Sequence, residues 1–93
     1  MKSIFSHEKY PFLLVANALC EEHRLEFILS EITSLGYQLV DQKWMAGGSQ
    51  EISIYWFIRG KDELILQEET YGGYKVFGQA NLLADIQHLA IKE

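Results

Sequence analysis

The sequence contains a single cysteine, Cys20, so no disulfide can form within the chain, which suits a reducing compartment. Residues 1–10 lack an apolar stretch that ends in a small-residue cleavage site, so they do not read as a signal peptide. The longest apolar run, around residues 11–20, is too short to cross a bilayer. Together these features predict a cytoplasmic protein.

Positive charge is also scarce. The chain has 8 lysines and arginines against 13 aspartates and glutamates, a formal net charge of −5. The basic residues are scattered along the sequence, whereas binding of phosphate backbones requires them in clusters. The charge pattern therefore argues against nucleic acid or an anionic membrane as a partner and leaves a basic protein partner open.

What is present is the composition of a globular domain. Of the 93 residues, 48% are hydrophobic and 23% are charged, which is enough for one core without disulfides or a structural metal. We expect a single domain over residues 10–93, preceded by a loosely ordered arm over residues 1–9.

Two segments have helical periodicity. Asn17 is a suitable N-cap for a first helix that runs to Leu35, and Gly36 suits the left-handed position that ends many helices. A second helix is expected from just after Gly78 to about Ile91. The apolar stripes of the two helices are Leu25, Ile28, Leu29, Ile32 and Leu35, then Leu82, Leu83, Ile86, Leu89 and Ala90.

The remaining segments read as strands separated by glycine-rich turns. Strands are expected over residues 10–16, 37–46, 52–59, 63–69 and 74–77. In the clearest of them, Ile52, Ile54, Trp56 and Ile58 alternate with Ser53, Tyr55, Phe57 and Arg59, and we expect the first set to face the core. The resulting order is β-α-β-β-β-β-α. We predict an α+β two-layer sandwich with a mainly antiparallel four- to five-stranded sheet and both helices on one face.

The candidates for catalysis are few. Cys20 and His23 are three residues apart and would be neighbours on the first helix, as in a nucleophilic Cys–His pair. No glycine-rich or oxyanion-type motif accompanies them, so a small hydrophobic residue beside a solvated histidine is the favoured interpretation. No catalytic residue is assigned.

Metal and cofactor sites are not predicted either. Glu22, His23 and Glu26 are close on one helix, but no second histidine follows at a ligating spacing. The glycine pairs at residues 47–48 and 72–73 fall between strands, where hairpin turns explain them without a phosphate site. The acidic residues Asp62, Glu63, Glu68 and Glu69 read as a solvated sheet edge that resists aggregation.

The strongest functional signal is a pair of aromatic residues. If Trp56 faces the core, then Tyr55 and Phe57 face outward, flanked by Glu51 and Arg59. Exposed aromatics anchor protein interfaces, so we predict a non-catalytic interaction domain that binds a protein partner or forms a homodimer through these four residues. Two alternatives stay open. One is a small-molecule-binding or enzymatic domain with a cleft near Cys20 and His23, and the other is an acidic inhibitor or immunity-type protein that masks a basic partner.

Overall fold

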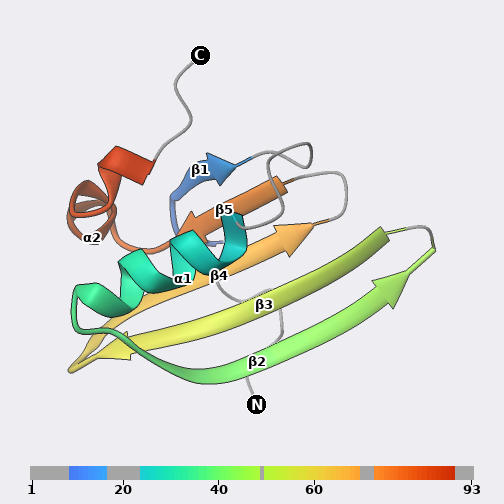
Figure 1. Ribbon diagram of the computed structural model, residues 1–93, viewed down its shortest axis with the longest axis horizontal. Coiled ribbons are helices and arrows are strands. Elements are labelled where there is room, and N and C mark those ends of the chain that lie inside the picture. Colours follow the sequence, from blue (N-terminus) through green and yellow to red (C-terminus); the bar gives the residue numbers. More distant parts are fainter. Residues whose placement is uncertain (1–8, 17–23, 49, 70–72, 90–93) are drawn as a thin grey trace.

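The computed structural model describes residues 9–16, 24–48, 50–69 and 73–89, and its element order is the expected one. Figure 1 shows the sheet with both helices on the same side of it. The elements are β1 (Phe12–Ala16), α1 (Arg24–Ser34), β2 (Gln38–Gly47), β3 (Gln50–Arg59), β4 (Asp62–Glu69), β5 (Gly73–Phe77) and α2 (Ala80–Ala84), followed by the 3₁₀ turn η2 (Gln87–Leu89). The predicted α+β sandwich is confirmed. Most of the predicted arm, residues 1–9, lies outside the described residues.

The sheet has five strands in the order β1-β5-β4-β3-β2, and every neighbouring pair is antiparallel. Strands β2 to β5 form a meander, because each strand pairs antiparallel with the next one along the chain. Gly48 and Gly60 supply the positive φ angles, 63° and 61°, that the first two turns require. Strand β1 then pairs with β5, so that β1 and β2 are the two edges.

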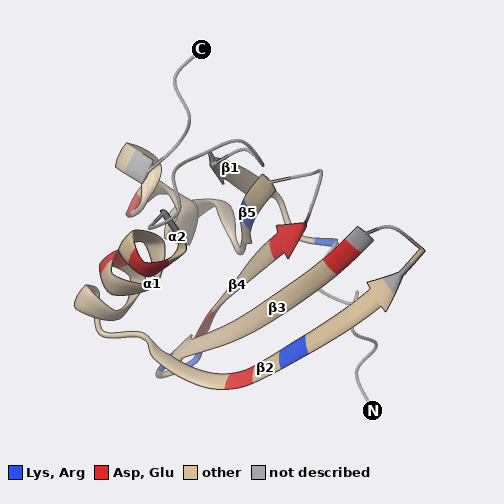
Figure 2. Cartoon of the chain, turned by 45° about the vertical axis from the view of Figure 1, so that its right-hand side comes forward, with Lys and Arg blue, Asp and Glu red and all other residues tan. Residues whose placement is uncertain are grey.

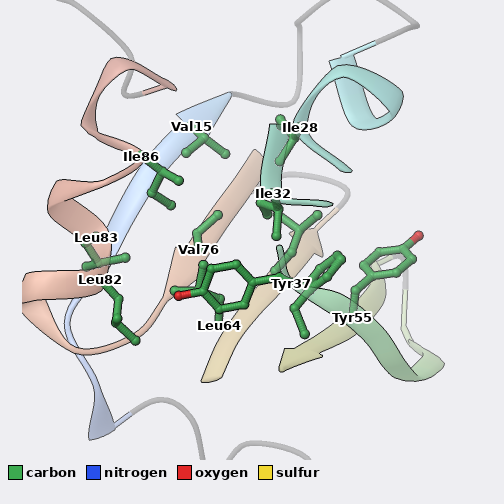
Figure 3. Packing of buried hydrophobic residues seen from close by; sticks show 12 residues of the cluster. Val15, Ile28, Ile32, Tyr37, Tyr55, Leu64, Val76, Leu82, Leu83 and Ile86 are labelled. Carbon is green, nitrogen blue, oxygen red and sulfur yellow. The ribbon is translucent and has the colours of Figure 1, made fainter. Parts of the chain in front are cut away.

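The main core lies between the sheet and the helices (Figure 3). Helix α1 contributes Ile28 and Ile32, and the segment from α2 onward contributes Leu82, Leu83 and Ile86. The sheet side is formed by Val15, Tyr55, Phe57, Leu64, Leu66 and Val76, with Tyr37 from the segment before β2. Both predicted helical stripes therefore face the same core, as expected.

The predicted orientation of β3 is wrong. Phe57 is fully buried and Tyr55 is 7% exposed, both on the helix side of the sheet. Trp56 and Ile58 point to the opposite face, where Trp56 is half-buried and Ile58 is exposed. The cause is that both faces of this central strand are apolar, so alternation by itself does not say which set meets the helices.

The face opposite the helices carries a second apolar cluster. Ile54, Ile65 and Phe77 are buried there, and Tyr10, Ile52 and Trp56 pack against them. The rings of Phe77 and Phe12 lie 5.4 Å apart between centroids. Trp56 therefore contributes to a core, although not to the one that the helices cover.

The last helix is shorter than predicted. Helix α2 ends at Ala84, and the chain continues through a turn into the 3₁₀ turn η2. The N–H groups of Asp85 and Ile86 donate to the carbonyls of Leu82 and Leu83, a spacing of three residues. A three-residue spacing still directs Leu83 and Ile86 to the same side. The predicted apolar stripe is therefore present, although the α-helix that carries it ends at Ala84.

Candidate protein-interaction site

The four residues predicted to bind a partner do not form an outer surface. Tyr55 and Phe57 are buried by the chain itself, so their predicted exposure is wrong. Glu51 is exposed, and by the alternation of β3 it shares their side of the sheet. Since the aromatic anchors are buried, the interface proposed from the sequence loses its basis at these positions.

Arg59 has a structural role inside the domain. Its Nη1 donates a 3.0 Å hydrogen bond to the carbonyl oxygen of Leu35, just past the end of α1, and its Nη2 donates to Asp62 Oδ2 at 3.2 Å. The guanidinium also lies over the Tyr37 ring, 4.5 Å from its centroid. Arg59 thereby ties the C-terminal end of α1 to the β3–β4 hairpin.

Tyr37 brings a polar group into the main core. The residue is 3% exposed, and its hydroxyl has no hydrogen-bond partner among the described residues. Figure 3 shows that hydroxyl directed toward Leu82 and Leu83 of α2. Burial raises the pKa of the Tyr37 phenol; the charge of Arg59 opposes the shift, and the carboxylates of Asp62 and Asp85 add to it.

We expect Tyr37→Phe to stabilise the domain by about 1 kcal/mol. The substitution removes a buried hydroxyl whose desolvation is not compensated, and it keeps the ring that contacts Arg59. Chemical denaturation of both proteins measures the effect. A loss of stability in Tyr37→Phe would show that the hydroxyl has a partner.

Tyr55 differs from Tyr37 in its surroundings. Burial raises the pKa of the Tyr55 phenol, the carboxylate of Glu68 raises it further, and a side-chain hydrogen bond with Ser53 lowers it in part. Its phenol is therefore neutral at physiological pH and serves as a core side chain.

The predicted acidic edge is also wrong. Strand β4, which carries Asp62, Glu63, Glu68 and Glu69, lies third in the sheet of five, between β5 and β3. These four side chains are half-buried, and cations lie beside Asp62 and Glu69. Asp62 pairs with Arg59, and Glu69 lies 3.7 Å from Lys75 Nζ.

The remaining sequence candidates give no site in the described part of the chain. Cys20, Glu22 and His23 lie outside the described residues. Within the described ranges, no three histidine, cysteine or acidic side chains come together to hold a metal. His88 Nε2 lies 3.8 Å from Glu31 Oε2, which is an ion pair only when the imidazole is protonated. A hollow of about 210 Å³ beside Lys61 and Gln79 is lined mainly by polar side chains, together with Leu82.

A more prominent surface is the open edge of the sheet along β2. This strand has ten residues and pairs only with β3 in the described structure. Three of its large apolar side chains are exposed: Leu39 at 45%, Val40 at 53% and Trp44 at 62%. In Figure 1, β2 lies at the margin of the sheet, away from both helices. We call residues 38–46 the β2 edge.

A β-bulge shapes this edge. Leu39 pairs with Phe57 and Asp41 pairs with Trp56, so Val40 is an extra residue with no directly opposed residue on β3. Beyond the bulge the strand is regular. The N–H of Gln42 donates to Asp41 Oδ1 at 2.8 Å and therefore points to the open side of β2. Trp44 and Ala46 follow Gln42 at two-residue steps and present their backbone groups on that same open side.

Sequence reasoning missed the β2 edge, although a signal for it exists. Residues 37–46 have imperfect alternation, which is the pattern that a bulge produces, and Trp44 directly follows the polar residues 41–43. What the local pattern does not reveal is that β1 joins the far side of the sheet and leaves β2 open.

Comparisons of the chain with protein-family models, with curated proteins and with solved structures found no match. No helix in the described ranges is long and apolar enough to span a membrane.

Proposed function

We propose that this domain is a non-catalytic protein-interaction module that acts in the cytoplasm and binds its protein partner through the β2 edge. The observation that carries the proposal is Trp44, a tryptophan 62% exposed on a strand whose outer edge has no partner strand among the described residues. Tryptophan is the residue type most enriched at the energetic centres of protein interfaces.

The backbone of β2 supports the same function. An edge strand presents a row of unpaired N–H and C=O groups, onto which another strand can be added. Long edges that also expose apolar side chains promote association, and monomeric proteins usually block them with charge or proline. The β2 edge contains no proline, and its two charged side chains, Asp41 and Lys43, have opposite signs.

Site-specific photocrosslinking in cells tests the surface directly. A photoreactive phenylalanine derivative is placed at Ala46, on the β2 edge, and as a matched control at Ala84, which is exposed on α2. We expect protein adducts from position 46 and none from position 84. Adding Trp44→Ser should abolish the adducts without unfolding the domain, because an exposed side chain contributes little to stability.

Equal adducts from both positions, or adducts that survive Trp44→Ser, would contradict the proposal. Salt dependence separates it from the acidic-inhibitor alternative. Association driven by net charge weakens steeply with ionic strength, whereas pairing through backbone groups and Trp44 changes little.

A further inference from the structure

Resting on the proposed function of the β2 edge, we propose that its partner is a second copy of this chain. The two copies join their β2 strands antiparallel around a two-fold axis at Gln42, so that the two sheets become one. The first support is the charge pattern of the edge. Asp41 and Lys43 flank Gln42 on either side. Figure 2 shows one acidic and one basic band on β2 with a short tan stretch between them.

The register of β2 with β3 places the two charges on one face. Asp41 lies opposite Trp56 and Lys43 lies opposite Ile54, and directly opposed residues of an antiparallel pair share a face. Both side chains are exposed. An antiparallel pairing that sets Gln42 against its own copy therefore brings Asp41 of each chain against Lys43 of the other, twice in one dimer.

Neighbouring registers lack this match. A two-fold axis one residue earlier would oppose the two copies of Asp41, and one residue later it would oppose the two copies of Lys43. Like charges directly opposite are destabilising in a sheet, and opposite charges contribute favourably. The pair of charges thus selects the register centred on Gln42 and disfavours those on either side of it.

The backbone fits the same register. Gln42 directs its N–H to the open side, where it now bonds to Asp41 Oδ1. In the dimer, the two copies of Gln42 form a hydrogen-bonded pair, each N–H donating to the other's carbonyl. The carboxylate of Asp41 is released from that N–H, which frees it to pair with Lys43 of the other copy.

The apolar side chains are self-complementary as well. Trp44 of one copy lies across from the bulge of the other, where Val40 is exposed. A two-fold interface uses each such contact twice. Because this pairing involves little more than one strand from each copy, we expect a dissociation constant on the order of micromolar.

Charge on an edge strand can also serve to prevent pairing. A protected edge strand repels the same strand of a second chain. This requires like charges to lie opposite each other in every accessible register. Asp41 and Lys43 repel only in the two registers that flank the one centred on Gln42. This arrangement of charges selects one register, whereas a run of residues with the same charge would disfavour every register.

Charge reversal tests the proposal by sedimentation equilibrium. Asp41→Lys alone and Lys43→Asp alone each convert both attractive pairs into repulsive ones, and we expect each to weaken self-association about tenfold or more. The double variant Asp41→Lys/Lys43→Asp restores two opposite-charge pairs and should recover dimerisation to within about threefold of the wild type. An equimolar mixture of the two single variants should associate more tightly than either alone.

Recovery in the double variant and in the mixture depends on the register and is not explained by a merely structural role of either residue. Circular dichroism and the unfolding midpoint serve as controls that all variants are folded. Single reversals that leave the dissociation constant unchanged would overturn the proposal, as would a double variant no better than the singles. A wild type that stays monomeric at several hundred micromolar would also overturn it. If position 46 still crosslinks to a different protein, the proposed function stands without the homodimer.

Discussion

Phe57→Ala should lower the free energy of unfolding by about 3–5 kcal/mol, the largest loss that we expect from a single side chain in this domain. Phe57 is fully buried in the main core, where the helices cover the sheet. Its removal takes away apolar burial and leaves a cavity that the surrounding side chains fill only in part. Because a domain of this size has a total stability of about 5–15 kcal/mol, the variant would be close to unfolding.

Ile58→Ala is the matched control for this prediction. Ile58 is the next residue on the same strand, but it lies on the opposite face and is 37% exposed. We expect its truncation to cost about 1 kcal/mol or less, since much of the side chain is already in water. Urea denaturation of the two variants measures both values. A large loss for Ile58→Ala with little change for Phe57→Ala would mean that β3 has the reverse orientation.

The second large effect is expected at Gly78, between β5 and α2. Gly78 is buried, and its N–H donates to the carbonyl of Pro11 at 3.1 Å. A Cβ atom at this position would lie 2.7 Å from Leu64 Cδ2 and 3.3 Å from the carbonyl oxygen of Glu63. Gly78→Ala should therefore cost about 1–3 kcal/mol, because a packed core has no room for the added carbon.

A double-mutant cycle identifies the cause of that loss. Leu64→Val shortens the side chain that the new Cβ would meet, so Gly78→Ala should cost less in the Leu64→Val background than in the wild type. Gly60→Ala provides a contrast, since a Cβ there meets nothing within 4 Å and only the φ of 61° opposes it. Strictly additive effects of Gly78→Ala and Leu64→Val would rule out the steric explanation.

Much of the fold follows from local sequence signals. Glycines at 48 and 60 locate two of the hairpins, and the stripes around Ile28 and Ile32 and around Leu82 and Leu83 locate the faces of both helical segments. These features depend on neighbours in sequence, which is why periodicity and turn chemistry reveal them. The early end of α2 was not predicted, because a 3₁₀ turn and an α-helix both bring Ile86 beside Leu83.

A different signal could have shown that the alternation of β3 leaves its orientation undecided. Gly60 and Lys61 form a two-residue turn closed by Arg59 and Asp62, and this turn fixes the register of the whole hairpin. Counting back from it places Phe57 opposite Leu64 and Trp56 opposite Ile65. The uninterrupted apolar run of residues 64–66 then indicates that β4 is covered on both faces, so that alternation within β3 could not choose between them.

The candidate site could not be found in this way. Whether Trp44 lies at an edge depends on where β1 joins the sheet, and no local pattern specifies that strand order. The predicted exposure of Tyr55 and Phe57 was wrong for the same reason, because only the tertiary structure determines which sheet face is covered.

The pairing of β1 with β5 has a consequence for synthesis on the ribosome. Phe12 pairs with Phe77 and Leu13 with Val76. Strand β1 therefore emerges from the ribosome more than 60 residues before the strand with which it pairs, β5. The hairpins of β2, β3 and β4 close over short loops and can form while the rest is being translated. A nascent chain at that stage exposes β4 at one margin and β2 at the other. Trp44 is thus available to other nascent chains before the domain is complete, and neighbouring ribosomes on one message would bring such chains close together.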